Sequence, residues 1–341
     1  LEALEKYSRA LELFAAGTDH ELALDLLEEA VAIDSGFAMA WRKLGVETVG
    51  DRALSIEALE KAYRHRDRLT ERERLLAEAQ FHYDVENEPR KAIAVFERMV
   101  DRDPSDSWAL NNLGASYVEI GEWAEAEHWV ARSVAVDSTI KSITNVAFAQ
   151  IQQGKLDEAE STLAIGDRIA PGNERSFNFH YGLEANREDW EAAESWAGRM
   201  RDESTDPAWA GVGTFQLGHL AGIRGHLGEA EQLYETSREE QVRAGLDFTS
   251  AGQMQMFDIN LDVRGDTARA IATLDAILET ERFEEKDVLN RPYLWLATWY
   301  ARAGDRRSAE SLLNRWESEV PAEYRRGLGV RNSLTHVDTY L

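Results

Sequence analysis

Histidine is the residue type in this chain best suited to metal binding, and eight histidines are present. A zinc site on one helix needs two of them four residues apart, as in H-E-x-x-H, and the sequence contains no such pair. His219 and His226 stand seven residues apart across a predicted turn. A metal site is one alternative for this pair and packing or groove lining is the other. We favour the second and expect no cofactor.

Other catalytic patterns are also missing from the sequence. It contains no G-x-S-x-G nucleophile elbow and no G-x-x-x-x-G-K-[ST] phosphate loop. The glycine-rich stretch 222–228 follows no predicted strand, which a dinucleotide-binding fingerprint needs. The chain has no cysteine, so thiol chemistry and disulfides are excluded. We therefore expect that this chain is not an enzyme.

The charge balance restricts the partners. The formal net charge is −25, from 63 acidic and 38 basic residues. Phosphate contacts need clustered lysine and arginine, so we expect no nucleic-acid partner. No apolar run reaches the roughly 18 residues of a membrane span, and no secretory signal is visible, so we expect no membrane insertion by this segment. We expect a cytoplasmic location, or a periplasmic or extracytoplasmic one if the chain belongs to a membrane-anchored sensor.

The elements that position any site are predicted by a repeat of alanines. Seven alanines follow one another at steps of 34, 33, 34, 37, 40 and 39 residues, and the same spacing extends back to two more. These repeat alanines are Ala23, Ala58, Ala92, Ala126, Ala159, Ala193, Ala230, Ala270 and Ala309. A repeat of this length is typical of stacked helical units. One helical hairpin buries too little apolar surface to fold alone, so we expect each unit to pack only on its neighbours.

Glycines and prolines mark the ends of the predicted helices. A glycine stands five residues before five of the repeat alanines: Gly121, Gly154, Gly225, Gly265 and Gly304. Glycine accepts positive φ without steric cost, so it ends one helix and lets the chain turn into the next. All six prolines fall where a helix should start or stop: Pro89, Pro104, Pro171, Pro207, Pro292 and Pro321. Each unit is therefore predicted as a helix, a tight turn and an antiparallel helix.

The repeat resembles the tetratricopeptide repeat (TPR) family. One unit carries the matching residues Leu113, Gly114, Tyr117, Gly121, Ala126 and Val130. The resemblance implies an all-α fold, a right-handed superhelical solenoid of about nine antiparallel helix pairs. It covers nearly the whole chain, so we expect residues 1–341 to form a single continuous array. The chain starts and ends within helical pattern, and we expect it to be excised from a longer protein.

A second, narrower resemblance concerns two short stretches. Residues 1–11 and 66–74 look like parts of the repeat region of some bacterial signalling proteins. In those proteins the array follows a serine/threonine protein kinase, a nucleotide cyclase or a winged-helix regulator. This resemblance implies a signalling role and a possible attached kinase or cyclase domain.

The TPR resemblance also implies a ligand groove. In that family positions five, nine and thirteen of each first helix face a concave groove. The candidate groove residues at those positions are Phe81, Asn111, Phe148, Asn178, Phe215, His219, Gln255, Ile259, Thr298 and Arg302. They are mostly amides and aromatic rings, which suit an extended peptide: the amides can bond its backbone and the rings can hold its side chains. The alternative is that they are neutral filler.

One TPR subtype binds carboxylate-terminal peptides through lysine, arginine and asparagine at these positions. This chain lacks the lysines, which argues against that mode, although Arg302 can pair with an acidic group. Our leading hypothesis is a non-enzymatic module that binds a protein or peptide partner in the groove. The alternative is a sensory or regulatory repeat domain that binds a small ligand or self-associates. A scaffold that binds through its convex surface is a third possibility.

Overall fold

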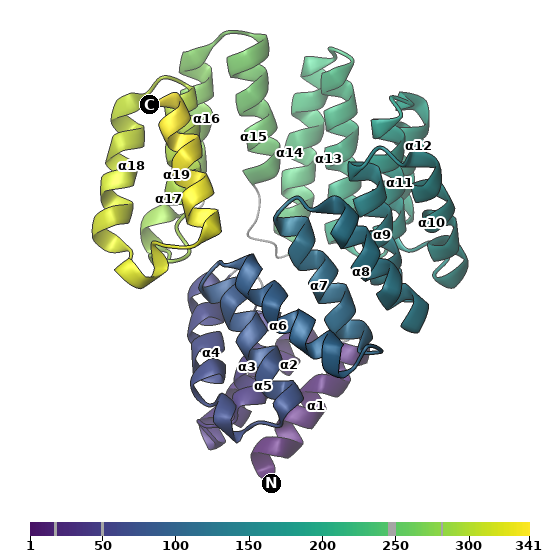
Figure 1. Ribbon diagram of the computed structural model, residues 1–341. Helices are drawn as coiled ribbons and strands as arrows, with labels where there is room; N and C mark the ends of the chain where they lie inside the picture. Colours follow the sequence, from purple (N-terminus) through teal and green to yellow (C-terminus); the bar gives the residue numbers. More distant parts are fainter. Residues whose placement is uncertain (17–18, 49–50, 245–249, 281) are drawn as a thin grey trace. The chain divides into compact units, whose positions relative to one another are not determined.

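The computed structural model describes residues 1–16, 19–48, 51–244, 250–280 and 282–341. These residues form α-helices and short 3-10 and π turns, and they contain no β-strand (Figure 1). In chain order the helices are α1 (Glu2–Ala16), α2 (His20–Ile33), α3 (Ala38–Glu47), α4 (Arg52–Arg64), α5 (Glu71–Gln80), α6 (Pro89–Arg102), α7 (Ser107–Glu119), α8 (Trp123–Val136), α9 (Ile140–Gln152), α10 (Leu156–Ile169), α11 (Glu174–Asn186), α12 (Trp190–Glu203), α13 (Pro207–Ile223), α14 (Leu227–Arg243), α15 (Ser250–Asp258), α16 (Thr267–Thr280), α17 (Tyr293–Arg302), α18 (Arg306–Glu319) and α19 (Leu328–Tyr340).

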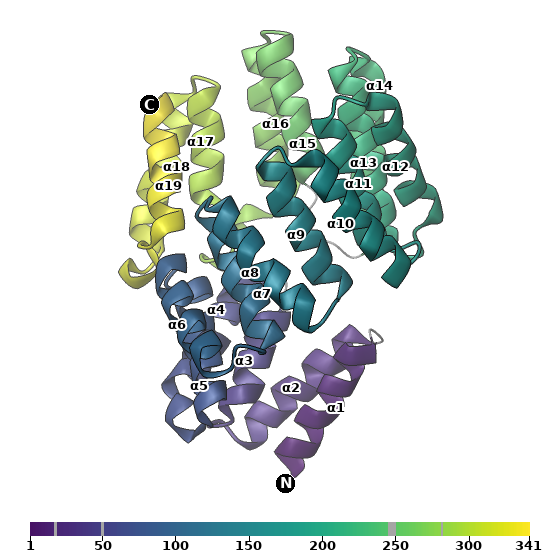
Figure 2. The ribbon, with the colours of Figure 1, turned by 45° about the vertical axis from the view of Figure 1, so that its right-hand side comes forward.

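Consecutive helices pack as antiparallel pairs. Each odd-numbered helix from α1 to α15 contacts the helix that follows it, and most pairs also contact the next pair along the chain. The hairpin of α13 and α14 is clear in both ribbon views (Figures 1 and 2). The predicted fold class, all-α with sequential antiparallel helix pairs, is confirmed.

The chain divides into two compact units. Unit 1 contains residues Leu1–Pro104, Lys286–Tyr293 and Leu313–Thr335. Unit 2 contains Ser105–Glu285, Leu294–Leu312 and His336–Leu341. In unit 1, residues near the end of the sequence therefore pack against residues near its start. The expectation that each repeat packs only on its sequence neighbours is wrong for this part. That residues 1–341 form one continuous array stays a prediction.

The repeat alanines lie in the contact between paired helices. All nine have a relative exposure of 0%. Opposite Ala126, a Cβ added at Gly114 would lie 2.3 Å from the Val130 side chain and 3.0 Å from the Ala126 carbonyl oxygen. Two helices can approach this closely only where both present small residues. The sequence period therefore reports the positions of closest helix approach, as predicted.

The turns within the helix pairs have the predicted backbone conformation. Seven positions, each five residues before a repeat alanine, have φ between 53° and 80°. They are Asn87, Gly121, Gly154, Glu188, Gly225, Gly265 and Gly304. Asn87 and Glu188 are not glycine, so the glycine pattern predicted only five of these seven turns. The helix ends predicted from the prolines are confirmed as well, because Pro89 and Pro207 begin α6 and α13 and the others lie between helices.

Two first helices end in a π turn. The turns η2 (Phe81–Val85) and η3 (Ile259–Val263) continue α5 and α15. Their backbone bonds close five residues back, from the Glu86 N–H to the Phe81 oxygen and from the Arg264 N–H to the Ile259 oxygen, each 3.0 Å. A π turn holds one residue more than an α turn. Predicted groove residues Phe81 and Ile259 therefore stand at the start of a π turn rather than inside a regular α-helix.

No helix among the described residues has the length and apolar character that crossing a membrane requires.

The regular turn allows a paired test of backbone strain. A Cβ at Gly154 would have nothing within 4 Å, and its φ is +72°, so Gly154→Ala changes only the backbone. We expect it to lower the free energy of unfolding by about 1 kcal/mol. We expect Glu188→Gly, at φ 58°, to raise it by roughly 0.5 kcal/mol because a left-handed side-chain residue is removed. Urea unfolding of both variants measures this. Equal effects of the same sign would contradict it.

Candidate functional site

Nine of the ten predicted groove residues lie in unit 2. Each is on the first helix of its pair or on the π turn that continues that helix, as the resemblance implied. Phe81 lies in unit 1 at the start of η2. Eight of the nine in unit 2 are half-buried, and Ile259 is buried. Their contacts divide them into residues that belong to a polar row and residues that pack in the core.

A polar chain of contacts joins three successive first helices. The Asn145 amide on α9 donates to the side-chain oxygen of Asn111 on α7, at 3.1 Å. Arg175 on α11 donates from Nη2 to Asn145 Oδ1 at 3.0 Å and from Nε to Thr144 Oγ1 at 2.7 Å. Neutral oxygens therefore hold the guanidinium of Arg175.

Arg175 occupies an unfavourable place for a cation. It lies in the first turn of α11, where its own N–H is bound by the N-cap residue Asn173 and the helix dipole repels positive charge. Burial lowers the pKa of Arg175, and no carboxylate among the described residues acts to raise it. A half-buried cation without a counter-ion breaks the usual rule for arginine. Such exceptions are expected at functional sites.

Aromatic rings stand beside this cation. The Arg175 guanidinium lies 5.3 Å from the centroid of the Phe179 ring. Phe179 in turn contacts Phe148 edge to face, with centroids 6.1 Å apart, and Phe148 contacts Trp123 at 6.0 Å. The predicted residue Phe148 is therefore half-buried between two other rings. It presents only part of its surface to a ligand.

A second polar contact joins α11 to a fourth first helix. Asn178 is three residues after Arg175 on α11, so the two share a helix face. The Gln216 amide on α13 donates to Asn178 Oδ1 at 2.7 Å, and the buried Gln216 Oε1 has no hydrogen-bond partner among the residues that the structure describes. We call these five residues on α7, α9, α11 and α13 the amide–guanidinium row: Asn111, Asn145, Arg175, Asn178 and Gln216.

His219 is held by a neighbouring first helix. The Tyr181 hydroxyl on α11 lies 3.0 Å from His219 Nδ1. Burial lowers the pKa of His219 and raises the pKa of Tyr181 to about 12. The hydroxyl is therefore the donor at neutral pH and the imidazole is neutral. His226 is exposed and faces Glu229 at 3.5 Å instead, so the two histidines have separate partners. Among the described residues no group of His, Asp and Glu is arranged to hold a metal ion.

Three predicted groove residues pack in hydrophobic clusters. Phe215 and Ile259 join the cluster around Tyr234 in unit 2, where the Phe215 and Tyr234 rings are 5.5 Å apart. In unit 1, Phe81 stacks on Tyr63 with centroids 4.1 Å apart. These contacts favour the filler alternative for these three positions.

Arg302 is already neutralised within unit 2. Its guanidinium donates to Asp258 Oδ1 at 2.7 Å and also pairs with Asp262. Burial is the larger influence on Asp258 and raises its pKa, while Arg302 lowers it. Thr298 donates to the Leu294 carbonyl oxygen at 2.8 Å, within its own helix. Gln255 is half-buried on α15. Arg302 thus has its acidic partner, but the partner belongs to the same chain.

Sequence reasoning missed several members of the row and one ring beside it. Thr144, Asn178 and Phe215 are at position five of their helices, and the next residues are Asn145, Phe179 and Gln216. Arg175 stands three residues before Asn178. Position six is turned by about 100° from position five, so a rule that selects positions five, nine and thirteen does not include it. Arg175, three residues before Asn178, does share a face with a predicted residue and could have been found by the same argument. The missing counter-ion of Arg175 could not be read from sequence, because it depends on which side chains surround the residue.

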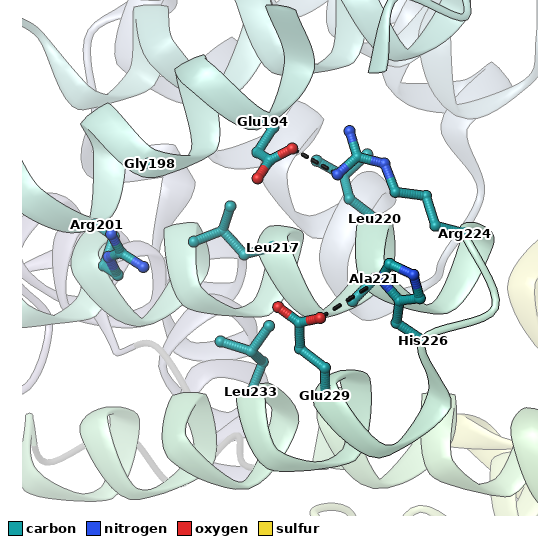
Figure 3. A pocket seen from close by; sticks show the side chains of 10 residues that line it. All are labelled: Glu194, Gly198, Arg201, Leu217, Leu220, Ala221, Arg224, His226, Glu229 and Leu233. Carbon is teal, nitrogen blue, oxygen red and sulfur yellow. Dashed lines mark hydrogen bonds and ion pairs between the residues drawn. The ribbon is translucent and has the colours of Figure 1, made fainter. Parts of the chain in front are cut away.

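A cavity of about 300 Å³ lies elsewhere in unit 2, between the second helices α12 and α14 and over α13 (Figure 3). Its apolar part is formed by Leu217, Leu220 and Leu233. The charged side chains at its rim are paired. Arg224 meets Glu194, and His226 meets Glu229, as the dashed lines in Figure 3 mark. The cavity therefore offers apolar surface with compensated charges. None of the ten predicted groove residues lines it.

Comparison with known proteins supports the fold. No protein-family model and no curated protein matches the chain. The crystal structure of a Rap protein complexed with Competence and Sporulation Factor aligns with 100% of this chain and 99% of its own, with TM-score 0.56 and 12% identity. PilW, a type IV pilus biogenesis factor, aligns with 58% of this chain and 92% of its own (TM-score 0.47, 18% identity). The thermophilic TPR protein TTC0263 of Thermus thermophilus aligns with 55% and 99% (TM-score 0.45, 17% identity). The likeness to the Rap protein shows a shared TPR-like fold.

The contact of Tyr181 with His219 predicts a low histidine pKa. We expect NMR titration to place the pKa of His219 below its ordinary 6.5, and Tyr181→Phe to move it upward because the donor to the neutral imidazole is lost. The unfolded chain then takes up this proton at higher pH than the folded chain. Its contribution to stability is therefore complete above pH 6.5 and decreases as pH falls toward the folded pKa. A His219 pKa at or above 6.5 would contradict the assignment.

Proposed function

We propose that this chain is a non-enzymatic protein-interaction module that binds an extended peptide segment along the amide–guanidinium row of unit 2. The observation that carries the proposal is Arg175, a half-buried cation held by neutral oxygens of Thr144 and Asn145. A ligand carboxylate would supply the missing counter-charge. Charge-assisted contacts of guanidinium with carboxylate are short, often bidentate and about twice as strong as neutral hydrogen bonds.

The rest of the row suits the backbone of such a segment. Each amide side chain carries both donor and acceptor groups, so it can bond a peptide N–H or C=O. Asn111 is joined to Arg175 through Asn145, Asn178 stands three residues after Arg175 on α11, and both asparagines are half-buried. Phe148 and Phe179 offer partly exposed ring surface for apolar side chains of the ligand. Binding would use the side chains of four successive first helices.

The net charge of the protein limits the ligand. At −25 the chain repels a segment that carries many acidic residues. The ligand we propose therefore has one carboxylate in an otherwise neutral or basic segment. That carboxylate can be an aspartate or glutamate side chain or a chain terminus. The missing lysines argue for the side chain.

The test replaces the cation and measures peptide binding. Short peptides with a single glutamate are screened by fluorescence anisotropy, beside matched peptides with glutamine and with an amidated C-terminus. We expect Arg175→Gln to weaken glutamate-peptide binding about 10- to 100-fold, the equivalent of roughly 1.5–3 kcal/mol for a charged hydrogen bond. Arg175→Lys keeps the charge but not the planar fork and should bind with intermediate affinity.

Arg168→Gln is the matched control, because this arginine is exposed on the second helix α10 of unit 2. It should leave binding unchanged. Loss of binding only after amidation of the peptide would assign the carboxylate to a chain terminus. Equal binding of glutamate and glutamine peptides that also persists after amidation, or full binding by Arg175→Gln and by a Phe148→Ala, Asn178→Ala double variant, would contradict binding at the row.

One observation supports the alternative of a sensory domain that binds a small ligand. The cavity between α12 and α14 is at the lower end of the size range of small-molecule sites, about 300–1,000 Å³. A regulatory domain attached to a kinase or cyclase would use such a cavity for a small, largely apolar ligand. Thermal-shift screening with Gly198→Leu as the blocked variant tests this, since Gly198 lines the cavity and is open to a side chain. The cytoplasmic location also remains a proposal.

A further inference from the structure

In unit 1 a segment near the end of the sequence packs on the second and third helix pairs. Leu289 and Tyr324 contact a buried cluster of Ile56, Leu59 and Val85. These three residues have relative exposures of 2%, 1% and 8%. Contacts between residues so distant in sequence are not needed by a repeat array, which is stabilised by its sequence neighbours. Packing between neighbouring repeats therefore does not account for these contacts.

Asn290 completes the N-terminus of α4. The Ala53 N–H donates to Asn290 Oδ1 at 2.9 Å, and the Asn290 amide donates to Asp51 Oδ1 at 3.0 Å. Asp51 is itself the N-cap and accepts from the Leu54 N–H at 3.0 Å. The first N–H groups of a helix have no partner within the helix. One of them is bound here by a side chain from 237 residues away.

Further contacts come from residues 324–331. The Tyr324 hydroxyl donates to Glu60 Oε1 at 2.9 Å. Arg331 forms a two-point contact with the Glu88 carboxylate, at 3.1 and 3.4 Å. The Leu328 N–H donates to the Asn87 carbonyl oxygen at 2.8 Å. These contacts are mostly polar and half-exposed, so they can exchange with water or with another chain.

At Gly327 the backbone of residues 324–331 comes very close to the backbone of Glu86 and Asn87. The φ of Gly327 is +105°, and a Cβ at this position would lie 2.4 Å from the Glu86 carbonyl oxygen. Only glycine allows this approach. The backbone at Gly327 therefore fits closely against Glu86 and Asn87, directly after η2, and a single methyl group is enough to obstruct this contact.

We propose that residues 286–290 and 324–331 form a releasable strap over an interaction surface made by α4 and η2. In the resting state the chain occupies this surface itself. When the strap is released, the surface binds a partner segment of the same chemistry, with an aliphatic residue directly followed by asparagine. The aliphatic side chain takes the place of Leu289, and the asparagine caps α4 in place of Asn290. This proposal concerns unit 1 and does not depend on peptide binding at Arg175.

Hydrogen exchange tests the release. The variant Asn290→Ala, Tyr324→Phe, Arg331→Ala removes three polar contacts of the strap, and we expect the amides at the start of α4 to exchange at least about tenfold faster. The matched control is Asn186→Ala, Tyr340→Phe, Arg306→Ala, which changes the same residue types at exposed positions of unit 2. Unchanged exchange in the first variant, or equal acceleration in the control, would overturn the strap.

A peptide in trans tests the surface. The probe is a labelled peptide of residues 284–293, used beside the same peptide with Asn290→Ala. We expect the triple variant to bind the first peptide at least about tenfold more tightly than the wild-type chain, and not to bind the second. Gly327→Ala opens the strap by obstruction and leaves every polar side chain in place, so it should bind too. No binding by either opened variant would overturn the interaction surface.

A cross-linked variant distinguishes release of the strap from misfolding of the protein. The chain has no cysteine, so Glu60→Cys and Tyr324→Cys introduce the only two thiols. A short bis-maleimide then holds the strap on α4. We expect the locked protein to keep its helical circular dichroism and to lose all binding of the 284–293 peptide, while the same variant before cross-linking binds it. Equal binding before and after cross-linking would contradict the proposal.

Discussion

Paired helices approach each other most closely at buried alanines, and the other features of the fold follow from this close packing. Where Ala126 faces Gly114 there is no room for a further methyl group, so the helices pack with almost no side chain between them. Apolar residues one turn away, such as Val130, then fill the space on either side. The turn must reverse the chain within a few residues, and positive φ at one position achieves this. Repeating this geometry aligns the first helices, and that alignment brings Asn111, Asn145 and Arg175 into contact.

The amide–guanidinium row has a different physical character from the core that positions it. The packing of the helices is complete within the chain. Among the described residues, in contrast, the charge of Arg175 meets neutral oxygens and an aromatic ring but no carboxylate. Arg302 illustrates the contrast, since two aspartates neutralise it. A charge that is already paired contributes to the fold. A charge that is held in place but not paired is available to a ligand, and this distinction separates the two arginines although both lie on first helices.

Unit 1 departs from the simple picture of a repeat array in another way. Its helix pairs contact residues 289 and 324, and the contact is specific, with an asparagine cap on α4 and a glycine at the closest backbone approach. On this face Leu289 and Tyr324 pack against the buried side chains of Ile56 and Leu59. Burial of these side chains by a distant segment removes apolar surface from water while using few, mostly polar, attachments. Such a contact can be stable and still exchangeable.

The helix pairs, their turns and their period could be predicted from the amino-acid sequence, because these follow from local rules: small residues at close contacts, glycine at positive φ and proline at helix ends. Even so, the glycine pattern missed that Asn87 and Glu188 adopt the same turn conformation without glycine. Which groove candidates come into contact could be seen only after the helices were placed in three dimensions. Phe215 and Ile259 pack inward, Asn145 and Arg175 join Asn111, and residues 289–290 reach α4. These outcomes depend on contacts between residues from about 20 to more than 230 positions apart. The repeat aligns the first helices but does not say which of their side chains meet.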